Sequence, residues 1–243
     1  METRQVKVVT LLTCWNRPGR LRVSLPQIVR ECESINSPLV VADDHSTHRE
    51  TLKLIDGLSS LYKNSWLIRR DYERKPYSSA HDCTGLNNLF AFRWIFENFD
   101  DATFVLKVDD DIELVPGAFR TMIETWEQAS RDGFDLIGIT GLQTIFEEDA
   151  KIERRPGYWV QRRGCFAAMM ISLDDWRQAF ADAREGSVMS KGFDCYFVID
   201  YVRPQRPNAV FVACDPGVVK HVAENGVHTG DADITLNYAG DIK

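Results

Sequence analysis

The sequence predicts an α/β fold built around one large sheet. Short apolar runs rich in β-branched residues alternate with segments whose apolar residues recur at helical spacing. Clusters of polar turn residues directly follow several of the apolar runs, as expected where strands end. The chain has 243 residues, which fits one large domain or two closely packed halves.

The first two strand and helix units lie in the N-terminal quarter. Residues 6–13 form an apolar run with many β-branched members, and Arg17-Pro18-Gly19 ends it before a helical segment. Residues 39–42 predict a short buried strand, followed by polar turn residues and a helix over about 49–60. This order indicates strand, loop, helix, twice over.

The central part repeats this order around an acidic triplet. We expect a strand at 65–70, a loop at 71–83, and then a helix in which Leu86 and Leu89 share one face. The strand at 103–108 runs straight into Asp109, Asp110 and Asp111, and Pro116 opens the next helix. The triplet therefore lies at the carboxyl end of a strand, the edge at which open α/β sheets bind ligands.

The second half is less regular and has an α+β character. Strands are expected at 134–140, 165–172 and 209–213, a helix from about Asp174, and an amphipathic segment over 193–202. No internal repeat or low-complexity tract interrupts it.

Composition narrows the class of protein. The net charge of −7 and pI near 5.3 argue against a general polyanion binder that relies on counterion release. The six cysteines show no Cys-x-x-Cys spacing and are expected to be reduced and mostly buried. The apolar run at residues 8–12 is too short for a signal peptide core or a membrane span, so a cytoplasmic protein is expected.

Two carboxylate groups follow strands. Asp109, Asp110 and Asp111 would repel one another unless a cation neutralises them, and oxygen ligands at this edge suit Mg²⁺ or Mn²⁺. Asp43 and Asp44 can accept hydrogen bonds from a nucleobase or ribose. The alternatives are a solvated acidic turn capping the helix at Pro116, and an N-cap for the helix near residue 49.

Three segments taken together resemble one enzyme family. Residues 13–18 (TCWNRP), 41–47 (VADDHST) and 108–117 (VDDDIELVPG) match, in order and spacing, motifs of the GT-A glycosyltransferases, particularly the family-2-like inverting enzymes. The resemblance covers residues 6–120 clearly and 160–230 more loosely. It implies a single GT-A domain, with a Rossmann-like nucleotide-sugar-binding half at 1–111 and an acceptor-binding half at 112–243 around one mixed sheet.

The resemblance also implies roles for individual residues. Asp43 would accept from the base with Asp44 beside it, Asp109 would approach the ribose, Asp110 would support the sugar, and Asp111 would bind the metal. Ala42 and His45 depart from the family pattern, and the triple Asp leaves its frame open by one position. The remaining residues implied to lie beside the donor are Thr13, Asn16 and Arg17.

An inverting transfer needs a base for the acceptor hydroxyl. Residues 191–196 resemble the family region in which an acidic residue begins a helix, and this nominates Asp194. The alternative is a first-turn carboxylate stabilised by the helix dipole.

A late segment resembles the family's histidine stretch. His221 and His228 flank Glu224-Asn225-Gly226, and either could reach the metal, with His228 preferred. Imidazole ligation favours Mn²⁺ over Mg²⁺. The alternative is an ordinary loop or core histidine.

Residues 151–163 interleave cations with aromatic side chains. Tyr158, Trp159 and Arg162 are candidates for acceptor recognition, by stacking on a sugar or by contacts to a nucleic acid. The acidic pI favours a glycan over a nucleic-acid acceptor, and the alternative is an exposed hairpin with solvated charges. Arg74, in the loop before the acidic strand, is a candidate for neutralising a diphosphate.

The sequence therefore predicts a glycosyltransferase that moves a sugar from a nucleotide-sugar, of the UDP type, to a hydroxyl acceptor with inversion, using Mn²⁺ or Mg²⁺. Two alternatives stay open. A nucleotidyltransferase-like enzyme would need a Gly-rich phosphate loop, for which Arg17-Pro18-Gly19-Arg20 is a poor match. A non-catalytic sugar- or nucleotide-binding module could use the same fold.

Overall fold

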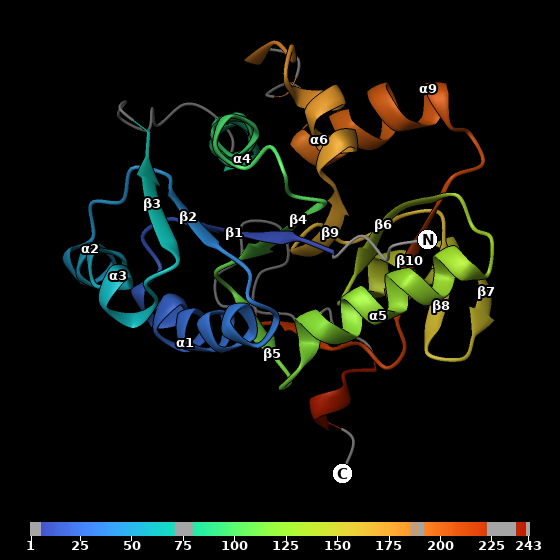
Figure 1. Cartoon of the computed structure of the whole chain (residues 1–243), viewed down its shortest axis with the longest axis horizontal. Helices are drawn as coiled ribbons and strands as arrows, with labels where there is room; N and C mark the ends of the chain where they lie inside the picture. Colours follow the sequence, from blue (N-terminus) through green and yellow to red (C-terminus); the bar gives the residue numbers. More distant parts are fainter. Residues whose placement is uncertain (1–5, 71–79, 186–187, 189–191, 223–236, 242–243) are drawn as a thin grey trace.

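One mixed sheet of nine strands organises the described part of the chain (Figure 1), with strand order β3-β2-β1-β4-β9-β6-β10-β8-β7. The structure is a computed structural model that describes residues 6–70, 80–185, 188, 192–222 and 237–241. The strands of the sheet are β1 (Val8–Cys14), β2 (Leu39–Asp43), β3 (Ser65–Arg69), β4 (Phe104–Asp109), β6 (Leu136–Thr140), β7 (Lys151–Arg155), β8 (Tyr158–Gln161), β9 (Ala168–Ser172) and β10 (Val210–Cys214).

The sheet divides into a parallel half and a mixed half. β3, β2, β1 and β4 are parallel neighbours, whereas β9 runs antiparallel between β4 and β6. β10 is parallel to β6, and the β7–β8 hairpin continues the sheet antiparallel to β10. A separate two-stranded ribbon pairs β5 (Ile112–Leu114) with β11 (Val219–His221).

Helices cover both faces of the sheet. In Figure 1, α1 (Pro18–Ile35) and α5 (Ala118–Arg131) lie on one face, and α4 (Ala80–Asn98) and α6 (Leu173–Phe180) lie on the other. The shorter helical segments are α2 (Arg49–Asp56), α3 (Leu58–Leu61), α8 (Phe193–Cys195), the π-helical η2 (Tyr196–Val202), α9 (Arg203–Gln205) and the 3₁₀ turns η1 (Ile145–Ala150) and η3 (Ala239–Asp241).

Strand alternation divides the core into two layers. Leu12 of β1 joins the layer beneath α1 and α5, whereas Leu11 joins the layer beneath α4 and α6. The second layer is rich in aromatic rings, with Trp176 stacked on Phe92 at 4.3 Å between centroids. Burial on both faces explains why β1, β2 and β4 are continuous apolar runs in the sequence.

The α/β fold class is confirmed, and a few local expectations are corrected. The helix expected over 49–60 is two helices separated at Gly57, and α4 begins at Ala80, inside the stretch expected as a loop. The strands β5 and β11 were not expected, because three residues carry too little pattern to recognise.

The structure also bears on the expectations about the cysteines and about a membrane span. The described cysteines at positions 14, 32, 165, 195 and 214 are thiols outside disulfide bonds, and Cys14, Cys32 and Cys214 are buried. Within the described residues, no helix has the length and apolar character needed to span a bilayer.

Candidate functional site

The carboxyl ends of β1, β2 and β4 bring the predicted donor residues together. Cys14 is in register with Asp43, and Thr13 with Asp109, because β1 lies between the other two strands. The Thr13 hydroxyl donates to Asp109 Oδ1 at 2.8 Å. We call Asp43, Asp44, Asp109, Asp110 and Asp111 the acidic cluster.

Arg17 lies between two of these carboxylates. Its Nη2 is 2.5 Å from Asp110 Oδ1, and its Nη1 is 2.5 Å from Asp111 Oδ2. Burial raises the pKa of Asp110 to about 7, against the opposing effect of Arg17. Burial also acts to raise the pKa of Asp111, but hydrogen bonding to His221 and the charge of Arg17 outweigh it and hold that pKa below its ordinary value. A guanidinium of this chain thus supplies part of the neutralisation that the sequence led us to expect from a metal.

His221 reaches the acidic cluster through the β5–β11 ribbon. The ribbon places His221 opposite Ile112, the residue after the triplet. His221 Nε2 lies 3.5 Å from Asp111 Oδ2, and this interaction raises the pKa of the imidazole. The backbone N–H of Val222 also donates to the Asp111 carbonyl at 2.8 Å.

A buried lysine holds the first carboxylate of the triplet. Lys107 is 1% exposed, and its Nζ lies 2.5 Å from Asp109 Oδ1 and 3.0 Å from the Phe166 carbonyl oxygen. Lys107 and Asp109 are two residues apart on one strand, so their side chains share a face. The single charge inside the apolar run of β4 is the sequence signal from which this pair could have been predicted.

The carboxylates after β2 are also paired. Asp43 is fully buried and accepts from the Ser46 N–H, with Arg69 Nε at 3.3 Å. Asp44 has Arg70 Nη1 at 3.3 Å.

Asn16 ties the loop after β1 to the loop after β2. Its Oδ1 accepts from the N–H groups of Thr47 and His48, both at 2.8 Å. The loops that we expected to contact the donor are therefore bonded to each other.

Both capping alternatives for the carboxylates are wrong. The N-cap of α2 is His48, whose side chain accepts from Glu50 N–H, and not Asp43 or Asp44. At the start of α5, the Glu31 carboxylate from α1 accepts from Gly117 N–H and Phe119 N–H. Asp110 and Asp111 are 1% and 8% exposed, so the triplet is not a solvated turn.

The acidic cluster and His221 offer few ligands of their own to a divalent cation. No group of three or more His, Cys, Asp or Glu side chains suited to a metal occurs among the described residues. Asp111 and His221 do offer an oxygen and a nitrogen side by side. Two protein ligands fit an ion that completes its shell with water and substrate phosphates.

Asp194 lines a cavity, and among the described contacts it makes no hydrogen bond or ion pair with the triplet. It belongs to α8 and is half-buried, and its Oδ1 accepts from the Cys195 N–H at 2.8 Å. The adjacent ring of Phe193 packs under the Lys107 ammonium, 5.2 Å from Nζ to the ring centroid. Asp194 is therefore connected to the acidic cluster through Phe193, Lys107 and Asp109.

The acceptor candidates at 151–163 separate in the structure. The segment forms the β7–β8 hairpin, in which Tyr158 is 1% exposed and donates its hydroxyl to Asp132. A buried ring offers no face for a sugar, so the stacking role expected for Tyr158 does not fit.

Trp159 is half-buried, and Lys151 Nζ lies 4.8 Å from its ring centroid. Its strand, β8, is four strand spacings from β4, which is about 19 Å. Arg162 is exposed and lines the same cavity as Asp194. Arg74 and His228 lie outside the described residues.

Comparisons with known proteins support the fold. No protein family model matches the chain, and no curated protein sequence does. Among solved structures, residues 1–349 of TarS from S. aureus match with a TM-score of 0.52 at 13% identity, over 86% of this chain and 58% of that one. A structure of TarS in complex with UDP-GlcNAc matches over 56% of this chain and 34% of that one, with a TM-score of 0.38 and 18% identity. A197 from STIV matches over 96% of this chain and 94% of that one, with a TM-score of 0.47 and 11% identity. The chain thus has an α/β fold similar to that of TarS and spans little more than half of that structure.

Proposed function

We propose that this protein is a glycosyltransferase that moves a sugar from a nucleotide-sugar donor, of the UDP type, to a hydroxyl acceptor with inversion. The observation that carries the proposal is the acidic cluster, held with Arg17 and His221 at the carboxyl ends of β1, β2 and β4. The fold similarity to TarS, whose residues 1–349 have also been solved in complex with UDP-GlcNAc, supports it. In this proposal residues 1–111 bind the donor and residues 112–243 bind the acceptor.

The donor contacts follow from the strand ends. Asp43 and Asp44 face the base, Asp109 faces the ribose and Asp110 the sugar, with Thr13 and Arg17 beside the diphosphate. Arg17 is placed to turn from its two carboxylates toward an incoming diphosphate, which is a stronger bidentate partner. Asn16 fixes the loop that presents Arg17, and Arg74 is kept as a further diphosphate contact.

Asp111 and His221 are the proposed metal ligands, with His228 as a third. When bound, Mn²⁺ or Mg²⁺ supplies Lewis-acid stabilisation of the leaving diphosphate. Once Arg17 has moved to the diphosphate, Asp111 regains a free oxygen for the ion, so binding of donor and metal should depend on each other.

The transfer step uses Asp194 as the general base. The acceptor oxygen attacks the anomeric carbon from the face opposite the diphosphate, and the bond from that carbon to the diphosphate oxygen breaks with its electron pair. The hydroxyl proton passes to the Asp194 carboxylate. The products are the inverted glycoside, the nucleoside diphosphate and a protonated Asp194 that returns its proton to water.

One observation favours a second candidate function. Because Arg17 already supplies part of the counter-charge for Asp110 and Asp111, the fold could bind a nucleotide or sugar with no metal and no chemistry, as a binding module.

A thermal-shift panel separates the two. We would measure the unfolding temperature with UDP, GDP, CDP and dTDP, each with and without Mn²⁺. At a ligand concentration of about 100 Kd, binding should stabilise the fold by about 2.7 kcal/mol. Stabilisation by one nucleotide that requires Mn²⁺ supports the glycosyltransferase, and stabilisation that ignores Mn²⁺ supports the module. No shift with any nucleotide contradicts both.

A further inference from the structure

A cavity of about 730 Å³ lies beside η2, the loop after β8 and the segment that leads into β10. Phe166, Val198, Ile152 and Ile199 give it apolar walls, and the last two are 52% and 59% exposed. Three basic side chains, Arg162, Arg163 and Arg203, line it as well. We call this space the arginine cavity.

The three arginines differ in how their charge is balanced. Arg163 is paired with Asp149 at 2.6 Å. Arg203 donates to the carbonyl oxygens of Ala209 at 2.6 Å and Arg162 at 2.5 Å, and no carboxylate pairs with it in the part of the chain that the structure describes. Arg162 likewise has no ion pair within the described ranges. The cavity therefore carries two guanidinium charges without an anionic partner among these residues.

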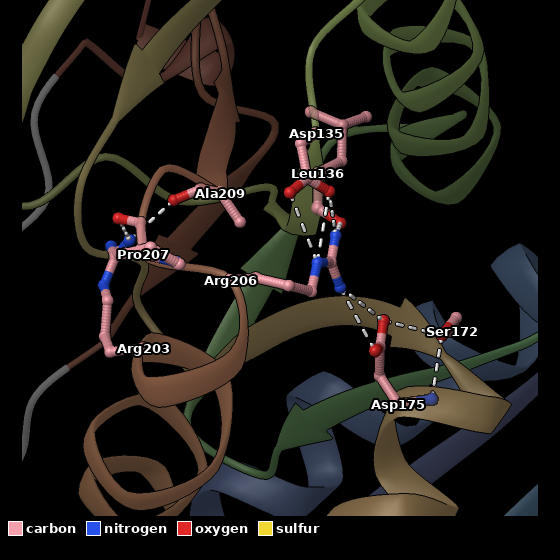
Figure 2. A network of polar contacts seen from close by, with 8 residues as sticks. All are labelled: Asp135, Leu136, Ser172, Asp175, Arg203, Arg206, Pro207 and Ala209. Carbon is pink, nitrogen blue, oxygen red and sulfur yellow. Dashed lines mark hydrogen bonds and ion pairs between the residues drawn. The ribbon is translucent and has the colours of Figure 1, made fainter.

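Arg206, on the next turn, shows the contrast. In Figure 2, Arg203 points toward Pro207 and Ala209, while Arg206 points the other way, to Asp135 and Asp175. The hydrogen bond with Asp135 is the main cause that raises the pKa of Arg206, whereas burial and the nearby charge of Arg162 lower the pKa of Arg203. One arginine is stabilised in its charged form, and the other lies where an added anion would stabilise it.

The cavity also holds the proposed base. Asp194 lines it, and Phe166, another lining residue, binds Lys107 of the acidic cluster through its carbonyl oxygen. A ligand in the cavity could thus present a hydroxyl to Asp194 while a second group lies against Arg162 and Arg203.

We propose that the arginine cavity is the acceptor site and that the acceptor is a sugar or polyol bearing a phosphate ester as well as the hydroxyl that is glycosylated. The acceptor role rests on the proposed function, but binding of the phosphate does not. A phosphate monoester carries the charge that balances two guanidinium groups, and its oxygens accept the paired hydrogen bonds that a guanidinium donates. The apolar walls hold the carbon skeleton, and Asp194 holds the hydroxyl end away from the anionic end.

Binding is tested first without donor or metal. Glucose 6-phosphate and glucose differ only in the phosphate, and glucuronate has a carboxylate in place of the whole phosphorylated C6 group. By calorimetry or protein NMR, we expect glucose 6-phosphate to bind at least about tenfold more tightly than glucose and more tightly than glucuronate. Equal affinity for all three overturns the proposal, and a preference for glucuronate overturns its choice of phosphate.

Paired variants locate the binding. Arg162→Gln should weaken the binding of glucose 6-phosphate about tenfold, and Arg162→Lys should restore part of it, because the charge returns without the guanidinium's paired donors. Arg163→Gln is the matched control, since Asp149 already balances that charge, and should change affinity less than about twofold. Equal losses in Arg162→Gln and Arg163→Gln overturn the assignment to the unpaired arginine.

Cys195 offers a second readout, because it is exposed and lines the cavity. In a Cys83→Ser, Cys165→Ser background, we would compare its modification by an anionic disulfide, DTNB, and a neutral one, 4,4′-dithiodipyridine. The anionic reagent should gain in relative rate at low salt, lose that gain in Arg162→Gln, and be slowed by glucose 6-phosphate. The proposal is overturned if the ratio of the two modification rates is unchanged by Arg162→Gln, by salt and by glucose 6-phosphate.

The two proposals fail separately. Phosphate-dependent binding in the cavity with no nucleotide shift upholds the anion site and rejects the glycosyltransferase. A Mn²⁺-dependent nucleotide shift without phosphate-dependent binding keeps the glycosyltransferase and rejects this acceptor class.

Discussion

The acidic cluster and the arginine cavity handle charge in opposite ways. In the cluster every buried carboxylate has a basic partner from this chain: Arg17 for Asp110 and Asp111, and Arg69 or Arg70 for the pair after β2. In the cavity, Arg162 and Arg203 have no carboxylate partner among the described residues, although Asp194 lines the same space.

Burial explains the difference. Asp110 is 1% exposed, and a buried charge without a partner would cost several kcal/mol, so the fold provides one. Arg162 is exposed to water, which tolerates an unpaired charge. A ligand that binds the acidic cluster must therefore displace internal ion pairs. A ligand that binds the arginine cavity meets the Arg162 guanidinium, which has no ion pair to break within the described residues.

The largest expected effect is on the cluster. Asp111→Ala should abolish Mn²⁺-dependent nucleotide binding, weakening it about 100-fold or more, because a direct ligand matters at least as much as its outer-shell partners. Titration of UDP in Mn²⁺ by calorimetry measures it, with exposed Asp101→Ala as the control. Metal-dependent binding that survives in Asp111→Ala would show that another residue holds the ion.

The next effect is on the residue that joins the two regions. Lys107→Met should lower the free energy of unfolding by about 3 kcal/mol, because the Asp109 carboxylate loses its buried partner. The Asp109 side chain is 25% exposed, so water reduces the cost of its unpaired charge. Urea denaturation measures it. The double variant Lys107→Met, Asp109→Asn should be less destabilised than the single one, and an additive loss would mean that the ion pair is not the cause.

A smaller effect tests whether Arg17 stands where a metal would act. Arg17→Ala should lose about 1–2 kcal/mol without metal, since Asp110 loses its counter-charge. Mn²⁺ alone should then raise the unfolding temperature of the variant more than that of the unchanged protein. The control is Arg22→Ala, which breaks an exposed pair with Glu50 and should cost no more than about 0.5 kcal/mol. Equal Mn²⁺ shifts in both proteins would contradict competition between Arg17 and the ion.

The smallest effects compare arginines near the cavity. Arg206→Gln should cost about 1–2 kcal/mol, because it breaks bonds to Asp135, Asp175 and the Leu136 carbonyl. Arg162→Gln should change stability by less than about 0.5 kcal/mol, since the residue is exposed and unpaired within the described chain. Thermal unfolding of both variants measures this. If Arg162→Gln were as destabilising as Arg206→Gln, Arg162 would stabilise the fold, and its charge would not be available to bind a ligand.

Much of the parallel half could be predicted from the sequence. β1, β2 and β4 were recognised because both of their faces are buried. A strand of this kind needs apolar residues at nearly every position, so it appears in the sequence as a continuous apolar run. The mixed half was harder, because β5 has three residues and η2 departs from the helical period. The place of Asp43, Asp44 and the triplet at strand ends was also readable, since a turn must follow each strand.

The sequence alone determined the α/β class, the order of the elements in the parallel half and the carboxylates at the strand ends, because these depend on periodicity and on neighbours along the chain. Only the tertiary structure decided the partners of those carboxylates. His221 meets Asp111 through the pairing of β11 with β5, and Arg203 lies against Arg162 because the α9 segment packs on the loop after β8. Such contacts depend on sheet order and register between segments far apart in the chain, and a local pattern carries no record of either.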